Sequence, residues 1–334
     1  MKNKILKNDR IFVAGSNGMV GNAVRNELIN SGYGNIENGG HLLTPSREQL
    51  DLSNNHDVNE WFAENKPSIV ILAAAKVGGI FANSQKPVDF ILENLKIQNN
   101  VIENSWRSGV KRLLFLGSSC IYPKYSSQPI EEEELLKGEL EETNEWYAIA
   151  KIAGLKLCES LRIQYGFDAI SLMPTNLYGT GDNYHPAYSH VMPALIKKFA
   201  DAKFLKQDTV TCWGSGSPRR ELMHVNDLAK AVIFVLENFY PGSKDSPVDS
   251  KERKLTYLNV GTGTDISIKE LAELIAEIID YDGKILWDKS KPDGTPVKLL
   301  NITRISQMGW KAEIDLKEGI KKTIKEYKNL SNYL

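Results

Sequence analysis

The feature that most constrains this sequence is a glycine-rich turn between a short apolar run and an amphipathic helical pattern. Residues 11–14 are apolar, and Val20, Val24 and Leu28 then recur at helical spacing until Gly32 ends the segment. The turn between them has the sequence Gly15-Ser16-Asn17-Gly18-Met19-Val20-Gly21. A strand, a tight turn and a helix in this order predict the first unit of a doubly wound α/β fold.

The three glycines of this turn have separate roles in the predicted unit. Gly15 permits the tight turn, Gly18 leaves room for a phosphate, and Gly21 allows the helix to pack closely on the strand. A helix N-terminus also offers unpaired backbone N–H groups and the positive end of the helix dipole. Residues 15–21 are therefore predicted to bind the diphosphate of a dinucleotide.

The end of the second predicted strand bears on which dinucleotide binds. Sites that prefer NAD(H) carry an acidic residue about 20 residues after the turn, where it binds the ribose 2′-hydroxyl. Residues 41–47 contain no acid and end in Arg47, whose guanidinium suits a 2′-phosphate. We therefore expect NADP(H) to be favoured over NAD(H). The alternative is that Arg47 is a surface charge that pairs with Glu48 or Asp51.

Short apolar runs alternate with helical patterns along the first half of the chain. The runs cover residues 11–14, 42–44, 69–75, 113–116 and 169–173, and a further run covers 255–260. Apolar residues at every position are typical of strands that are covered on both faces. The alternation predicts right-handed βαβ units, and hence an α/β protein with a Rossmann-type, doubly wound parallel sheet. We expect residues 1–175 with 224–262 to form this domain, and 176–223 with 263–334 to form a smaller, discontinuous one.

Composition and charge exclude several other classes of protein. The 41 Lys and Arg residues balance 42 Asp and Glu residues, so the net charge of −1 gives no footprint for nucleic acid or for an anionic membrane. The longest apolar run has only the residues 69–75, whereas a membrane helix needs roughly 20. Three widely spaced cysteines and the absence of zinc-binding motifs argue against a disulfide framework and against a metal site. With no apolar signal region near the N-terminus, we expect a cytoplasmic protein.

A second group of motifs contains candidate catalytic residues. Tyr147 and Lys151 are four residues apart on a predicted helix, so phenol and ammonium share one face. A neighbouring cation should lower the phenol pKa from its usual value near 10, and such a tyrosine can exchange a proton with a carbonyl oxygen. The helix follows the fourth strand, which ends near Ser118, so a hydroxyl is expected beside the same oxygen.

Long stretches of the chain resemble the extended short-chain dehydrogenase/reductase family. Within it, the sequence is most similar to the branch that epimerises GDP-4-keto-6-deoxymannose at C3 and C5 and reduces it at C4. The resemblance runs from about residue 10 to about residue 325. The matching stretches are residues 14–21, 73–80, 114–123, 147–159, 173–179, 213–216, 259–263 and 290–296.

The resemblance implies roles for five residues in catalysis. Ser118, Tyr147 and Lys151 match the reductive triad of the family. Cys120 and His190 match its epimerisation pair, in which one residue removes a proton beside the ketone and the other returns a proton on the opposite face. From the residues alone, Cys120 is equally well read as a small buried hydrophobe, and His190 as a structural histidine.

Further residues are implied in binding of the cofactor and of a GDP-linked 4-keto sugar. Lys198, Trp213 and Arg220 match positions that hold the GDP half of the substrate, and Asp288 matches a further substrate contact. The segments that line the nicotinamide comprise Leu116, Gly117, Ser118 and Ser119, together with Pro174, Thr175, Asn176 and Leu177, and Tyr147, Lys151 and His190 also contact the cofactor. The family relationship also implies a homodimer that packs through residues 87–108 and 148–165.

Two departures from the family pattern keep alternatives open. Asn17 replaces the usual arginine of the turn, so the preference for NADP(H) depends more heavily on Arg47. Trp146 replaces the usual proline before Tyr147 and is expected to reshape the sugar pocket. A reductase without epimerisation, acting on a GDP-4-keto heptose, is the main alternative. A dehydratase or UDP-sugar 4-epimerase, and a non-catalytic nucleotide sensor, are further ones.

The segment 131–145 carries eight glutamates and one lysine. Such a charge run is typical of a solvated loop, and we expect that here. The alternative is a lid over the active site that repels wrongly placed anions.

Overall fold

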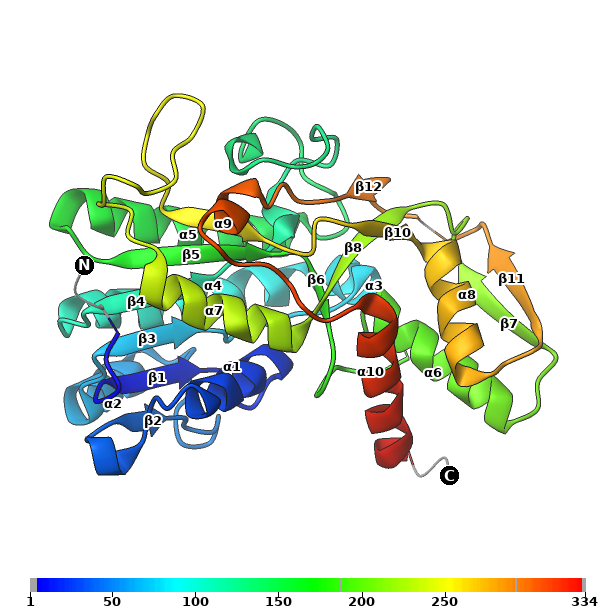
Figure 1. The fold of residues 1–334 in the computed structure, drawn as a ribbon, viewed down its shortest axis with the longest axis horizontal. Helices are drawn as coiled ribbons and strands as arrows, with labels where there is room; N and C mark the ends of the chain where they lie inside the picture. The colour runs from blue at the N-terminus through cyan, green and yellow to red at the C-terminus, as the bar shows by residue number, and fades with distance from the viewer. Residues whose placement is uncertain (1–4, 187, 292, 332–334) are drawn as a thin grey trace.

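A six-stranded parallel sheet forms the larger part of the structure, a computed structural model that describes residues 5–186, 188–291 and 293–331. The strand order is β2-β1-β3-β4-β5-β9 (Figure 1). The strands are β1 (Arg10–Ala14), β2 (His41–Leu43), β3 (Ile69–Leu72), β4 (Arg112–Leu116), β5 (Ala169–Pro174) and β9 (Tyr257–Val260). Every neighbouring pair is parallel, which confirms the predicted doubly wound α/β sheet.

Each face of this sheet is covered by helices. In β3, Ile69 and Ile71 belong to one hydrophobic core, whereas Val70 and Leu72 belong to the core on the other face. Two helices cover the first face, α1 (Met19–Asn30) and α7 (Val225–Asn238), and three cover the second, α2 (Asn55–Asn65), α4 (Pro87–Arg107) and α5 (Glu145–Tyr165). Burial on both faces explains why β3 is apolar at every position.

A second group of elements lies at the carboxyl ends of the large sheet (Figure 1). Its strands are β6 (Asn176–Tyr178), β7 (Thr209–Trp213), β8 (Arg219–His224), β10 (Asp265–Ser267), β11 (Lys284–Asp288) and β12 (Val297–Lys298). Its helices are α6 (Val191–Phe204), α8 (Ile268–Ile279) and α10 (Leu316–Ser331), and they share a third hydrophobic core. The sequence patterns did not predict these six strands, because most are short and polar. The pattern of residues 213–220 predicts a loop, but β8 begins inside this segment. The division into two domains at the bounds given above stays a prediction.

Element boundaries differ from expectation at two further places. A serine followed three residues later by a glutamate predicts a capping box at Ser267 and Glu270, and this box is present at the start of α8. The sequence predicts a mostly helical segment over residues 308–334, but α10 begins only at Leu316, and residues 332–334 lie outside the described part of the chain. The remaining short helices are α3 (Ile80–Gln85) and α9 (Thr303–Gln307). Within the described residues, no helix combines the length and apolar character that a membrane span requires.

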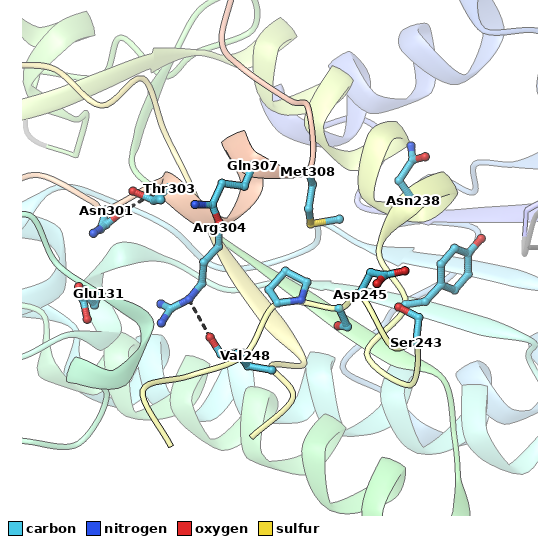
Figure 2. A pocket seen from close by; sticks show the side chains of 13 residues that line it. Glu131, Asn238, Ser243, Asp245, Val248, Asn301, Thr303, Arg304, Gln307 and Met308 are labelled. Carbon is cyan, nitrogen blue, oxygen red and sulfur yellow. Dashed lines mark hydrogen bonds between the residues drawn. The ribbon is translucent and has the colours of Figure 1, made fainter. Parts of the chain in front are cut away.

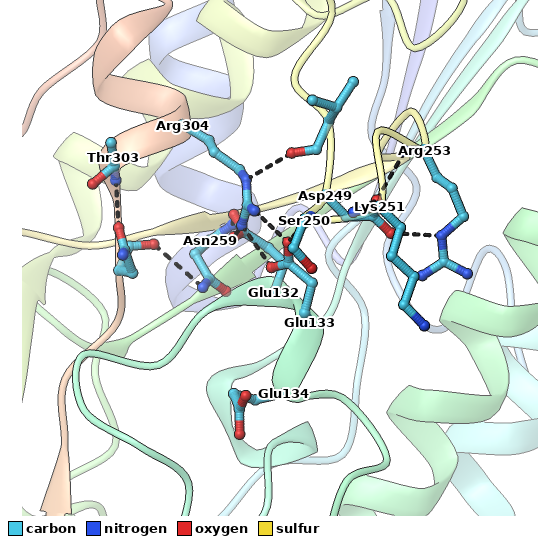
Figure 3. A network of polar contacts seen from close by, with 12 residues as sticks. Glu132, Glu133, Glu134, Asp249, Ser250, Lys251, Arg253, Asn259, Thr303 and Arg304 are labelled. Atoms are coloured by element: carbon cyan, nitrogen blue, oxygen red, sulfur yellow. Dashed lines mark hydrogen bonds and ion pairs between the residues drawn. The ribbon is translucent and has the colours of Figure 1, made fainter.

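The expectation of a solvated loop at residues 131–145 is wrong at its most acidic part. The Glu132 side chain is buried, accepts a hydrogen bond from the Asn259 N–H at 2.9 Å and forms an ion pair with Arg304 (Figure 3). Arg304 also donates to a Glu133 carboxylate oxygen at 2.9 Å. Burial raises the pKa of Glu132, and Arg304 and the Asn259 N–H oppose that rise. The charges are paired across the fold with a residue that is distant in sequence.

The far end of the same segment reaches the candidate site. Glu141 is buried and forms an ion pair with Lys124 at 3.0 Å. It also lines the cavity described below. The segment therefore contributes a fixed wall of that cavity.

Candidate active site

The glycine-rich turn has the geometry that diphosphate binding requires. A Cβ atom on Gly15, whose φ is +87°, would lie 2.7 Å from Ala74 Cα, and a Cβ atom on Gly21 would lie 2.0 Å from the Gly15 carbonyl oxygen. No side chain can be added at either position without moving the backbone. Gly18 is different, because its Cβ position is open apart from one oxygen at 3.5 Å. The tight glycines thus shape the turn, and the open one leaves space for a ligand.

The residues of the turn fit a phosphate group. Gly18 precedes α1, and no side chain caps the first backbone N–H groups of this helix. The Ser16 hydroxyl is buried and has no hydrogen-bond partner among the described residues. Buried polar groups are normally paired, so this hydroxyl is suited to donate to a bound oxyanion. Met19 and Val20 line the large cavity beyond the turn.

Arg47 lies just beyond β2 and is exposed. It lowers the pKa of Glu48 and of Asp51, although hydrogen bonds with serines are the larger cause in both carboxyls. Its guanidinium is therefore near these carboxylates and also open to solvent. From this position Arg47 can pair with the acids, and it can also reach a 2′-phosphate as predicted.

A cavity of about 590 Å³ gathers most of the predicted site residues. It opens at the carboxyl ends of β4 and β5, beneath the second group of elements. The predicted residues that line it are Met19, Val20, Leu116, Gly117, Ser118, Ser119, Cys120, Tyr147, Lys151, Pro174, Thr175, Asn176, Leu177, His190, Lys198, Trp213 and Arg220. The predicted residues outside its lining are Gly15, Ser16, Asn17, Gly18, Gly21, Arg47 and Asp288.

Tyr147, Lys151 and Ser118 meet at the bottom of this cavity. Lys151 is buried, donates to the Leu116 carbonyl oxygen at 2.8 Å, and has its ammonium nitrogen 5.8 Å from the Tyr147 ring centroid. Burial lowers the pKa of Lys151 to about 7. Burial also raises the pKa of Tyr147, as does Cys120, while a hydrogen bond with Ser118 lowers it. The expected lowering of the phenol pKa by the lysine is therefore wrong for this structure, because desolvation raises this pKa and the hydrogen bond with Ser118 is what opposes it.

Cys120 lies among polar neighbours at the wall of the cavity. Ser118 caps the short 3₁₀ turn Ser119–Ile121, accepting from the Cys120 N–H at 3.2 Å. The Cys120 sulfur lies 3.6 Å from the Lys298 ammonium and 3.6 Å from the Asn144 amide nitrogen, and both groups can donate to it. A cysteine that served only as packing would not need these two donors.

His190 lies at the start of α6, on the same cavity. Its side chain is accessible from the cavity. Desolvation by the surrounding protein lowers the pKa of its imidazole, and the charge of Lys298 lowers it further. Its imidazole is therefore mostly neutral at neutral pH and can accept a proton.

The predicted nucleotide contacts lie on one side of the cavity. The Lys198 ammonium is 5.5 Å from the Trp213 ring centroid and donates to the Thr211 carbonyl oxygen at 2.9 Å. Burial lowers the pKa of Lys198. The indole of Trp213 is 49% exposed, which leaves a flat apolar surface available to a base. Asp288 is placed differently, because its carboxylate accepts two hydrogen bonds from Ser290 and does not line the cavity.

Three cavity residues were missed by the sequence analysis. Lys298 pairs in register with Arg220 on the neighbouring parallel strand, so both cations face Cys120. Asn144 precedes α5, and Asp293 accepts from the Arg220 guanidinium through its backbone oxygen at 3.5 Å. Asp293 lies inside a stretch that matches the family, which was the available signal. Lys298 and Asn144 had no signal of their own, because only folding brings them beside Cys120.

A second cavity, of about 660 Å³, lies between α9 and the loop that follows α7 (Figure 2). Arg304 lines it, but its guanidinium is already paired with Glu132 and Glu133. None of the predicted site residues lines this cavity. Among the described residues, no group of three or more His, Cys, Asp or Glu side chains is arranged to hold a metal ion.

Comparison with known proteins decides the family. The model of the NAD dependent epimerase/dehydratase family matches residues 11–247, which is more than half of the chain. The chain belongs to this family. The sequence-based assignment to the extended short-chain dehydrogenase/reductases is thereby confirmed.

Relatives at higher similarity cover nearly the whole chain. A protein of Oryza sativa subsp. japonica named probable GDP-L-fucose synthase 1 is 52% identical over 96% of this chain and 92% of its own length. GDP-L-fucose synthase of Escherichia coli (strain K12) is 48% identical over 95% of this chain and 96% of its own length. Among solved structures, a GDP-mannoheptose C4 reductase from Campylobacter jejuni with NADP bound has a TM-score of 0.84 and 38% identity, covering 97% of this chain and 99% of that chain.

Proposed function

We propose that this protein converts a GDP-linked 4-keto-6-deoxy sugar to the 4-hydroxy sugar, with epimerisation at C3 and C5 and with NADPH as the reductant. The observation that carries the proposal is that the residue sets expected for reduction and for epimerisation line a single cavity. The names of the rice and E. coli relatives, which are GDP-L-fucose synthases, support a GDP-linked deoxy sugar as the product. The NADP in the C. jejuni structure supports the cofactor.

The reduction step uses the phenol of Tyr147 as the acid. NADPH, when bound along residues 15–21 and 174–177, supplies the hydride for C4 of the sugar. The raised pKa of Tyr147 keeps its phenol protonated at neutral pH, so it can give this proton to the sugar O4. Ser118 donates to the same oxygen and orients it. Lys151 lies close enough to Tyr147 to favour loss of the phenol proton when its own amine is protonated.

The epimerisation step uses the acidity that the 4-ketone gives to the protons at C3 and C5. Cys120 and His190 act as the acid and base, one removing a proton and the other returning a proton on the opposite face. Removal of the proton leaves an enolate, and Tyr147 and Ser118 stabilise its oxygen by hydrogen bonding. Lys298 donates to the Cys120 sulfur and so orients it toward the ring. The neutral imidazole of His190 is able to accept a proton.

The GDP half of the substrate is assigned to the side of the cavity that carries Lys198, Trp213 and Arg220. The two cations suit the diphosphate, and the exposed indole suits stacking of the guanine. Asp288, at the end of β11, stays a proposed contact for the substrate.

We also propose a homodimer, in the cytoplasm. Support for the dimer comes from exposed apolar side chains on α4 and α5, where Val88, Leu92 and Ile149 are 64%, 46% and 39% exposed. Support for the compartment comes from the three cysteines, which are all free thiols, as a reducing compartment maintains them.

One reaction in D2O tests the proposed double activity. Purified protein is mixed with GDP-4-keto-6-deoxymannose and NADPH, and the product is examined by mass spectrometry and proton NMR. The proposal predicts consumption of NADPH together with deuterium at both C3 and C5. Conversion without consumption of NADPH would contradict it and would favour a dehydratase or a 4-epimerase.

A second candidate function is reduction at C4 without epimerisation, on a GDP-4-keto heptose. The similarity to the C. jejuni GDP-mannoheptose C4 reductase favours it, and so does Trp146, which is 37% exposed beside Tyr147. NADPH consumption without deuterium in the ring would establish this alternative for the substrate tested.

A further inference from the structure

A short segment after β6 crosses the first turn of α1. We call residues 179–183 the strap. A Cβ atom on Gly181 would lie 3.6 Å from Met19 Cα, so the backbone of the strap passes close to the first turn of the helix. Strap and turn line the same cavity, through Gly181, Asp182 and Asn183 on one side and Met19 and Val20 on the other. The strap is therefore a second wall beside the glycine-rich turn.

The C-terminal helix α10 holds the strap. The Gly181 N–H donates to a Glu326 carboxylate oxygen at 2.9 Å, across 145 residues of sequence. The Tyr184 and Tyr327 ring centroids are 4.5 Å apart, which adds an apolar contact just beyond the strap. Residues at the end of the chain thus fix a segment that borders the cofactor site.

We propose that Glu326 is a positioning residue for the cofactor, because it holds the strap against α1 and so completes the diphosphate site. This inference rests on the proposed function, since it requires a dinucleotide at residues 15–21. Cofactor affinity depends on the fraction of molecules with a closed strap, because the observed dissociation constant equals the intrinsic one divided by that fraction.

The contact between strap and α10 is sensitive to charge. One carboxylate oxygen of Asp182, one of Glu326 and the Tyr184 hydroxyl are buried without a hydrogen-bond partner among the described residues. Burial raises the pKa of Asp182 to about 7, and the charge of Glu326 adds to this. The charged and titratable groups that interact here come from four places in the fold. They are Asp182 of the strap and Tyr184 just after it, His224 of β8, Asp227 of α7, and Lys322, Glu326 and Tyr327 of α10.

Two variants at one position test the proposal through cofactor binding. Glu326→Ala removes the acceptor, and we expect the dissociation constant of NADPH, measured by its fluorescence, to rise about fivefold as the closed fraction falls to about one fifth. Glu326→Gln keeps an acceptor for Gly181 and adds a donor for Asp182, so binding should stay within about twofold of the unchanged protein. Lys325→Ala, an exposed change on the same helix, is the control. The affinity for GDP, measured by calorimetry, should be the same in all variants.

Limited proteolysis of the unchanged protein gives an independent readout. Chymotrypsin should cleave after Tyr184 slowly, and NADP+ should slow it further, whereas Glu326→Ala should be cleaved several times faster. Equal NADPH affinity and equal cleavage in Glu326→Ala would overturn the role of Glu326 and leave the proposed function intact. Failure of the unchanged protein to bind NADPH at all would instead overturn the proposed cofactor site, and this inference with it.

Discussion

At the scale of single residues, the reductive site depends on the half-buried phenol of Tyr147, which lines the cavity. Tyr147 has a raised pKa because desolvation outweighs its hydrogen bond with Ser118, so it holds its proton at neutral pH. Its partner Lys151 is fixed by the Leu116 carbonyl and titrates near 7. The surroundings thus shift the two pKa values in opposite directions, although the two residues are only four positions apart in the sequence.

The variant Tyr147→Phe tests the role of this phenol. Loss of the general acid should lower NADPH oxidation by roughly 10²- to 10⁴-fold while NADPH binding is retained. Tyr165→Phe, on the exposed end of the same helix, is the control and should keep full activity. Oxidation is followed by absorbance and binding by fluorescence. A fully active Tyr147→Phe protein would exclude Tyr147 as the acid.

At the scale of elements, the packing of α1 on β1 depends on Gly21. A Cβ atom at this position would lie 2.0 Å from the Gly15 carbonyl oxygen, a contact between two backbone segments that have no room to relax. Gly21→Ala should therefore lower the free energy of unfolding by about 1–3 kcal/mol and weaken NADPH binding.

Urea unfolding measures this effect, with Gly242→Ala as the control. A Cβ atom on Gly242 meets no atom within 4 Å, so its replacement should change stability by no more than about 0.5 kcal/mol. Equal unfolding midpoints for the two variants would show that the turn is more adaptable than its geometry indicates.

The strap should give cofactor binding a pH dependence. The Asp182 pKa is raised from its usual value near 4 to about 7. At pH values between these two, the Asp182 carboxylate therefore takes up a proton when the strap closes. The closed form then loses stability as pH rises toward 7, and NADP+ affinity should fall from pH 5 to pH 8. The ratio of affinities for the unchanged protein and Asp182→Asn should change over this range. A ratio independent of pH would contradict the assignment.

At the scale of the whole molecule, the exposed apolar residues of α4 and α5 predict self-association. Replacing Leu92, which is 46% exposed, by Glu should convert a dimer to a monomer, because an unpaired charge would be buried in the interface. Light scattering after size-exclusion chromatography measures the mass of each species. Ile36→Glu is the control, because Ile36 is 74% exposed and lies outside α4 and α5. A monomeric unchanged protein would refute the predicted dimer.

Local sequence patterns are sufficient to predict the larger sheet and the motifs of the site. Runs that are apolar at every position, the glycine-rich turn and the four-residue spacing of Tyr147 and Lys151 are local signals, and each reflects an interaction within one or two elements. The residues expected around Ser118 and Cys120 follow the same logic, since strand ends in a parallel sheet meet at one edge.

Contacts between groups that are distant in sequence depend on how the elements pack in the folded protein. Lys298 lies beside Cys120, Glu132 pairs with Arg304, and Glu326 holds Gly181, in each case across more than a hundred residues. Such pairings leave no periodic pattern, because they arise from the packing of separate elements. The same packing set the pKa of Tyr147 against expectation, since desolvation depends on the atoms that surround a side chain and not on its neighbours in sequence.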